Sequence, residues 1–134
     1  MFVIDASVVV KWFIEESDSP QALQLKDDHI KGAAILLAPT LLLYEVANVL
    51  LFSRLFSSAG IKKSILDLYN LEIDFINPAP DITSQAIELA YPRKITFYDA
   101  SYLAIAKAFD IKLITADRKL FSSAKDLHCI KLLS

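Results

Sequence analysis

The chain has a single cysteine, Cys129, and only two histidines, His29 and His128, among its 134 residues. One cysteine excludes an intramolecular disulfide and a cysteine-based zinc site. Any metal ion must therefore be held by oxygen ligands or by the two histidines. Both histidines have polar and charged neighbours in the sequence, so we expect them to be ordinary surface residues.

A hydrophobic run long enough to cross a membrane is also absent, although 54% of the residues are hydrophobic. The longest apolar stretch, Ala33 to Leu43, is interrupted by Pro39 and Thr40, whereas a transmembrane helix needs about 20 apolar residues. Asp5 interrupts the place where a signal peptide would have its apolar region, and no basic segment precedes it. We expect one cytoplasmic domain, residues 1–134, without membrane contact.

The chain lacks a large net charge of either sign. The formal charge of -2 gives no general attraction to nucleic acids, so RNA binding would depend on local basic patches and on metal ions. A small domain cannot bury so many apolar residues, and contiguous exposed apolar patches usually mark association surfaces. We therefore expect an oligomer or a partner protein.

Short apolar runs alternate with helical patterns along the whole chain. Residues 7–14 suit either a buried strand or a helix, and we favour a helix. We expect Thr40 and Thr96 to start two helices and Pro92 to mark the end of another. The expected strands are 1–4, 34–38, 75–78, 112–115 and 129–133, and the expected helices are 7–14, 20–32, 40–56, 57–72, 81–91, 96–109 and 119–124.

This alternation predicts the fold class. Buried strands that alternate with helices are joined by right-handed crossovers, which place helices on both faces of a parallel sheet. We therefore predict an α/β fold with three layers, α/β/α, around a parallel sheet of four to five short strands.

Four acidic residues interrupt the apolar runs. Asp5 follows the first expected strand, and Asp117 follows the fourth. Asp99 lies in the first turn of one helix, and Glu45 lies in the second turn of another. Ligands of open parallel sheets gather beyond the carboxyl ends of the strands, where all four would meet. Their hard oxygen atoms favour Mg²⁺ or Mn²⁺ over zinc.

Three of these acids have a simpler explanation as helix caps. Asp5 and Asp117 each precede a short helix, and Thr96 to Asp99 has the spacing of a capping box. Acidic residues are favoured at helix starts in any protein. Four acids at one rim of the sheet are nevertheless more than independent capping explains, and this joint occurrence favours a metal site.

Glu45 is harder to explain as a cap. Its helix is apolar nearly all round, which predicts that the helix is buried. A buried carboxylate needs a partner, and the alternative to a metal ion is an ion pair with Arg54 or with a residue from elsewhere in the chain.

The motifs around the acids resemble those of the PIN-domain nucleases, and more closely those of VapC-like toxins from VapBC-type toxin–antitoxin pairs. The resemblance covers essentially the whole chain. The motifs are Asp5-Ala6-Ser7, Tyr44-Glu45-Val46-Ala47-Asn48, Tyr98-Asp99-Ala100-Ser101-Tyr102-Leu103-Ala104 and Thr115-Ala116-Asp117-Arg118.

The resemblance implies a metal-dependent endoribonuclease, with RNA as substrate, an antitoxin as partner and a homodimer as the assembly. It assigns one or two Mg²⁺ or Mn²⁺ ions to a catalytic cluster made of Asp5, Glu45, Asp99 and Asp117. It also assigns hydrogen-bond support of these acids to Ser7, Asn48 and Thr115. Some members carry a further acid where this chain has Lys119, which makes a second ion less certain.

Basic residues near the acids are candidates for phosphate contacts. They are Lys11, Arg118 and Lys119, each of which could equally be a solvated surface charge. Apolar residues of two successive helices are candidates for a dimer surface or an antitoxin groove, with core packing as the alternative. They are Phe52, Leu55, Phe56, Ile61 and Ile65.

Other functions fit the sequence less well. A haloacid-dehalogenase-type phosphatase needs a second acid two residues after the first, where this chain has Ser7. A receiver domain needs a phosphate-accepting aspartate after the third strand, where Asn77 and Pro78 lie. An RNA-processing nuclease outside a toxin system and a non-catalytic binding module both stay open.

Overall fold

A computed structural model describes all 134 residues and contains a five-stranded sheet with the order β3-β2-β1-β4-β5. Every neighbouring pair of strands is parallel. At the centre of the sheet, Val3 aligns with Leu37 on one side and with Leu113 on the other. The strands are β1 (Phe2–Ile4), β2 (Leu36–Pro39), β3 (Asp74–Ile76), β4 (Lys112–Thr115) and β5 (Ile130–Leu132).

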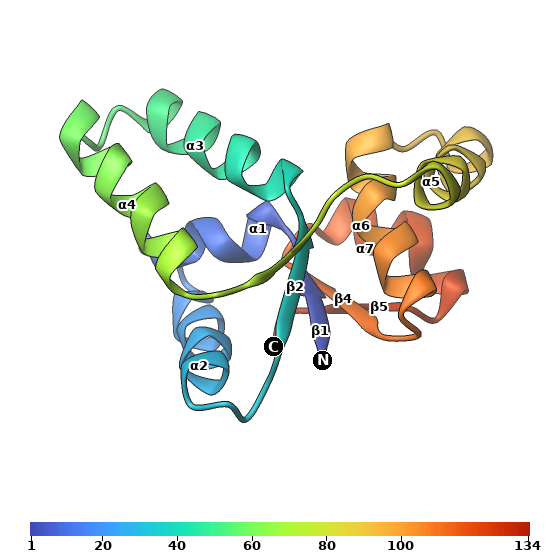
Figure 1. The fold of residues 1–134 in the computed structure, drawn as a ribbon, viewed down its shortest axis with the longest axis horizontal. Coiled ribbons are helices and arrows are strands. Elements are labelled where there is room, and N and C mark those ends of the chain that lie inside the picture. Colours follow the sequence, from blue (N-terminus) through green and yellow to red (C-terminus); the bar gives the residue numbers. More distant parts are fainter.

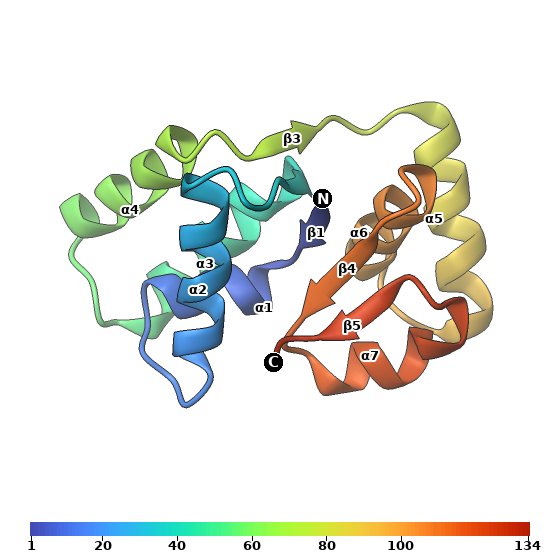
Figure 2. The same cartoon turned by 90° about the horizontal axis from the view of Figure 1, so that it is seen from below.

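Helices cover both faces of the sheet (Figure 1). Helices α1 to α4 lie on one side and α5 to α7 on the other, and Figure 2 shows the same division from below. The helices are α1 (Ala6–Val9), α2 (Ser19–Ile30), α3 (Leu41–Ser53), α4 (Ser58–Asn70), α5 (Pro80–Arg93), α6 (Phe97–Ala108) and α7 (Arg118–Ala124), with 3-10 turns at Val10–Trp12 and Lys125–Leu127. The predicted three-layer α/β fold is confirmed.

The order of the strands reverses between β1 and β4. The chain moves outward from β1 through β2 to β3, crosses the sheet with α5 and α6, and then builds β4 and β5 on the other side of β1. Loops leaving β1 and β4 therefore turn to opposite faces and open a crevice at the carboxyl ends of these strands. Asp5 follows β1 and Asp117 lies two residues after β4, so the topology places both acids at this crevice.

The core lies between the sheet and both helix layers. Strand residues such as Ile4, Leu37 and Leu113 are almost fully buried because helices cover them from above and below. Helix α6 contributes Tyr102, the largest of the fully buried side chains, and half of its residues are buried. This packing fixes the position of α6 against the central strands and therefore the position of Asp99 in its first turn.

Several helix boundaries differ from the expectation. The helix expected over 7–14 exists, but it is split into α1 and a 3-10 turn. Thr40 does not cap α3 with its side chain, since its backbone is already helical. Helix α3 ends at Ser53 rather than near Phe56, because Arg54 adopts a left-handed backbone with φ of 58°.

Pro92 does not end α5 but lies inside its last turn, followed by Arg93. Proline lacks a backbone N–H and its ring crowds the carbonyl four residues earlier, so the helix can continue only briefly. It stops at Lys94, whose φ of 54° is left-handed. No helix of the structure combines the length and the hydropathy that crossing a membrane requires.

Helix α3 is not buried all round, contrary to the expectation from its composition. Leu42, Val46 and Leu50 form its buried face, whereas Phe52 is 76% exposed. The expected association surface is also divided: Leu55 is exposed, while Ile61 belongs to the core. The other exposed apolar residues of α3 and α4 are Tyr44, Val49, Leu51, Leu66 and Tyr69.

Lys11 is buried and ties the first 3-10 turn to the start of α2. Its Nζ lies 2.5 Å from Glu16 Oε2 and 2.7 Å from Asp18 Oδ1. The sequence had suggested either a phosphate contact or a solvated surface charge for Lys11. Both expectations are wrong, because the side chain is buried and its ammonium is paired with two carboxylates.

We predict that Lys11→Met lowers the free energy of unfolding by about 1 to 2 kcal/mol, since a buried charge-assisted contact is lost while the apolar stem is kept. Urea unfolding measures this change. Lys31→Met is the matched control, because Lys31 forms an exposed pair with Asp27 that should contribute little. Equal losses in the two variants would contradict the structural role of Lys11.

Candidate active site

All four acids predicted from the sequence line one small pocket at the carboxyl ends of β1 and β4. Its volume is about 140 Å³. The lining residues are Asp5, Ala6, Ser7, Glu45, Asp99, Tyr102 and Asp117. A larger cavity of about 510 Å³ lies elsewhere, between α2 and the sheet, and contains none of these acids. The chemically distinctive site is therefore the smaller one.

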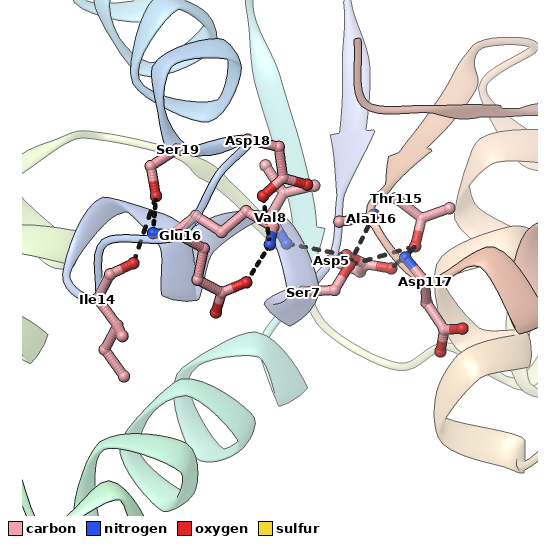
Figure 3. Close-up of polar contacts among 11 residues, drawn as sticks. Asp5, Ser7, Val8, Ile14, Glu16, Asp18, Ser19, Thr115, Ala116 and Asp117 are labelled. Atoms are coloured by element: carbon pink, nitrogen blue, oxygen red, sulfur yellow. Dashed lines mark hydrogen bonds and ion pairs between the residues drawn. The ribbon is translucent and has the colours of Figure 1, made fainter.

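Asp5 is the most constrained of the four acids (Figure 3). It caps α1, and its Oδ1 accepts a hydrogen bond from the backbone N–H of Val8 at 3.3 Å. The hydroxyl of Ser7 donates to Oδ1 and that of Thr115 donates to Oδ2, each at 2.5 Å. Since β1 and β4 are neighbours in the sheet, these bonds fix the carboxylate across the crevice. Ser7 and Thr115 thus provide the hydrogen-bond support that the resemblance implied.

The two hydroxyl groups are themselves held in place. The backbone N–H of Ala116 donates to Ser7 Oγ at 2.8 Å, and that of Asp117 donates to Thr115 Oγ1 at 3.1 Å. With their oxygens accepting from the backbone, both hydroxyls are oriented to donate to Asp5. The backbone after β4 therefore orients the acid that follows β1.

Burial raises the pKa of Asp5 from its ordinary value of 3.8 to about 6. The hydrogen bonds from Ser7, Thr115 and Val8 act in the opposite direction, and the negative charge of Asp99 adds to the rise. The site therefore holds a carboxylate at a net electrostatic cost, which a bound proton or a cation would relieve.

Glu45 is held by a tyrosine rather than by a cation. The hydroxyl of Tyr102 donates to Glu45 Oε1 at 2.5 Å, and the expected alternative, an ion pair with Arg54, is absent. Burial raises the pKa of Glu45, the Tyr102 hydrogen bond lowers it, and the charge of Asp99 raises it further. Burial beside Glu45 also raises the pKa of Tyr102, which keeps its hydroxyl protonated as a donor.

Tyr102 was not among the site residues predicted from the sequence. A signal was present, because Tyr102 lies three residues after Asp99 and thus on the same face of α6. Asn48 was expected to support the acids, but it is exposed and makes no side-chain hydrogen bond. The hydrogen bond that Glu45 accepts comes from Tyr102 instead.

Asp99 forms only half of the expected capping box. Its backbone N–H donates to Thr96 Oγ1 at 3.0 Å, so Thr96 caps α6, but the Asp99 carboxylate returns no hydrogen bond. Burial raises the pKa of Asp99, and repulsion from Asp117 raises it further. The carboxylate is therefore left available to the pocket.

Asp117 does cap its helix. Its Oδ1 accepts from the backbone N–H groups of Lys119 and Leu120 at 2.9 and 3.0 Å. The capping explanation is thus confirmed for Asp117, while Oδ2 accepts no bond. Arg118 and Lys119 are exposed beside it, and neither forms an ion pair.

No cation balances the negative charge of the pocket. None of its four carboxylates takes part in a salt bridge. As the side chains stand, no three of them are close enough together to form a ready-made metal site. The pocket thus combines an excess of negative charge with oxygen ligands only, which is the donor set that hard divalent cations prefer.

The sequence profile described as "PIN domain" matches residues 2–127. The chain belongs to the PIN-domain family. The match includes β1 with Asp5, α3 with Glu45, α6 with Asp99 and the turn with Asp117, so every acid of the pocket lies within the PIN domain.

Solved structures share the fold at low sequence identity. PAE2754 from Pyrobaculum aerophilum has 24% identity and a TM-score of 0.71, with 98% of this chain and 88% of that chain covered. A toxin–antitoxin complex from Klebsiella pneumoniae has 20% identity, a TM-score of 0.68 and coverage of 91% of both chains. VapC20 from Mycobacterium tuberculosis, a sarcin-ricin loop cleaving toxin, has 14% identity, a TM-score of 0.70 and coverage of 92% and 95%. No curated protein matches the chain.

The raised pKa of Asp5 predicts how the stability of this PIN domain varies with pH. Between pH 3.8 and about 6 the folded chain binds more protons at Asp5 than the unfolded chain does, so this contribution to stability is lost as pH rises. Asp5→Asn should therefore raise the unfolding free energy at pH 7.5 without metal by about 1 to 3 kcal/mol.

Urea unfolding in EDTA at pH 7.5 and at pH 4 measures this gain, which should shrink at the lower pH. Asp74→Asn is the matched control, because Asp74 is exposed and forms no ion pair. A variant at Asp5 that is less stable than wild type at pH 7.5 would show that the ionised carboxylate stabilises the fold.

Proposed function

We propose that this PIN domain is a metal-dependent endoribonuclease that hydrolyses RNA phosphodiester bonds. The observation that carries the proposal is the pocket of four carboxylates without a compensating cation. Asp5 is buried and Glu45 and Asp99 are half-buried, and carboxylates taken out of water in this way are paired, protonated or bound to a metal ion. A phosphodiester is itself an anion, so a site of this charge needs cations to accept it.

The ligands in this proposal are Asp5, Glu45, Asp99 and Asp117, which would hold one or two Mg²⁺ or Mn²⁺ ions. Such an ion lowers the pKa of a bound water molecule and neutralises charge on the phosphate and the leaving oxygen. Asp5 and Asp99 are the principal ligands, and Glu45 and Asp117 complete the cluster or orient water. Lys119 stands where some PIN nucleases have a further acid. With one carboxylate fewer, the site is better suited to one metal ion than to two.

The remaining residues of the site act by positioning. Ser7 and Thr115 hold the Asp5 carboxylate, and Tyr102 holds one oxygen of Glu45. Arg118 and Lys119 stand exposed beside Asp117, where they would contact the phosphates of the RNA strand. Lys11 is unsuited to that task, because Glu16 and Asp18 already bind its ammonium.

Asp5→Asn and Asp99→Asn should each abolish Mg²⁺- or Mn²⁺-dependent RNA cleavage. The measurement is the rate at which purified protein cleaves single-stranded RNA, with and without EDTA. Urea unfolding of both variants verifies that they are folded under the conditions of the cleavage assay. Full activity in either variant would contradict the assignment.

Ser7→Ala serves as the intermediate variant in the same assay. It leaves every ligand in place but removes one hydrogen bond from Asp5, so cleavage should fall by about 10- to 100-fold rather than vanish.

The proposed biological role is that of a VapC-like toxin acting in the cytoplasm and paired with an antitoxin protein. Support comes from the fold shared with a toxin–antitoxin complex and with a toxin that cleaves the sarcin-ricin loop. The exposed apolar face of α3, with Phe52 in its last turn and Leu55 in the connection that follows, offers a surface for a homodimer or for an antitoxin helix. An RNA-processing nuclease outside a toxin system would share the chemistry, whereas a binding module would show no cleavage.

We expect the isolated chain to be a homodimer and Phe52→Glu to convert it to a monomer, since a buried charge at an apolar interface is costly. Light scattering coupled to gel filtration measures the mass. Ile87→Glu is the control, because Ile87 is a comparably exposed residue on α5, in the opposite helix layer. A wild-type chain that stays monomeric at high concentration would exclude the dimer.

A further inference from the structure

A second pocket opens beside the acidic one, with a volume of about 140 Å³. It lies at the carboxyl ends of β2 and β3, where these strands meet α5 and the start of α6. No charged side chain lines it. Its floor and walls include Pro39, Leu41, Ile105 and the ring residues Phe97 and Tyr98.

Two helices connect the second pocket directly to the acids. On α6, Asp99 and Tyr102 line the acidic pocket, whereas Tyr98 and Ser101 line the second one. On α3, Leu41 lines the second pocket and Glu45, one turn later, lines the acidic pocket. One helical turn is about 5.4 Å, so the two pockets are neighbours at the scale of one nucleotide.

The chemistry of the second pocket suits a flat, neutral ring. Phe97 and Tyr98 line the pocket and are 42% and 59% exposed, so both aromatic residues are partly accessible to solvent. The side chains of Thr40, Thr83 and Asn77 also line the pocket and make no hydrogen bond within the protein. An apolar cavity with a few free polar groups binds a ring by stacking and by hydrogen bonds to its edge.

We propose that this second pocket binds one unpaired nucleobase of the RNA next to the phosphate at the acidic pocket. This proposal rests on the proposed nuclease function and adds that the protein recognises one base of its RNA substrate. RNA-binding proteins recognise single-stranded bases by stacking them on aromatic side chains and by hydrogen bonds to their edges. With no charged side chain in its lining, the pocket suits a neutral base better than a phosphate.

The test is a base-preference measurement with three variants. Tyr98→Ala removes a stacking surface, and Thr83→Leu fills the pocket from the partly exposed face of α5. Tyr91→Ala is the matched control, since Tyr91 is 84% exposed on α5 and lines neither pocket. Each protein cleaves a random-sequence single-stranded RNA pool with Mn²⁺, and sequencing of the products gives the base frequencies around the cleaved bond. Circular dichroism verifies folding.

Wild type and Tyr91→Ala should share a base preference at one position beside the cleaved bond. Tyr98→Ala and Thr83→Leu should flatten that preference and lower kcat/KM by about tenfold, mainly through KM. An oligonucleotide that lacks the base at this position should be cleaved equally by wild type and Thr83→Leu. Unchanged base frequencies in both pocket variants would overturn this inference alone. Absence of any Mn²⁺-dependent cleavage by wild type would instead remove the proposed function, and this inference with it.

Discussion

The burial of the Asp5 carboxylate is the constraint on which the rest of the site depends. Its two oxygens accept hydrogen bonds from Ser7 and Thr115, but no positive side chain comes near, and its pKa rises to about 6. Hydrogen bonds orient this carboxylate without neutralising it. The fold therefore carries a destabilising charge at the crevice between β1 and β4, which is the expected mark of a residue kept for binding or chemistry rather than for stability. Burial also raises the pKa values of Glu45 and Asp99, so their ionised forms are disfavoured in the same way.

Topology explains why the acids meet. The reversal of strand order between β1 and β4 brings the residues after both strands to one crevice, while α3 and α6 begin at the same rim and add Glu45 and Asp99. The buried packing of α6 against the central strands then presents two neighbouring surfaces to the rim. One bears Asp99 and Tyr102, and the other bears Tyr98 and Ser101. Placing charge and stacking surfaces one helical turn apart suits a substrate in which phosphates and bases alternate.

The layers of the fold and the four acids could be predicted from the sequence, because both follow from local patterns. Short apolar runs alternating with helices imply a parallel sheet, and acids directly after strands must lie at its carboxyl edge. Features that depend on three-dimensional packing could not be predicted. The partner of Glu45, Tyr102, comes from a helix 57 residues away. The burial of Lys11 depends on how the chain turns from the 3-10 segment into α2. The apolar composition of α3 suggested burial on all sides and could not separate its buried face from the exposed one, although Phe52 was a candidate for an association surface.

A titration of the metal-free protein with Mn²⁺, followed by electron paramagnetic resonance of the free aqua ion, would show whether the four acids hold a divalent cation. Wild type should bind Mn²⁺ saturably, Asp99→Asn should bind it clearly more weakly, and the melting temperature should rise as the ion binds the folded state alone. The exposed-acid variant Asp74→Asn should bind like wild type. Failure of wild type to bind Mn²⁺, or equal binding by wild type and Asp99→Asn, would contradict the account.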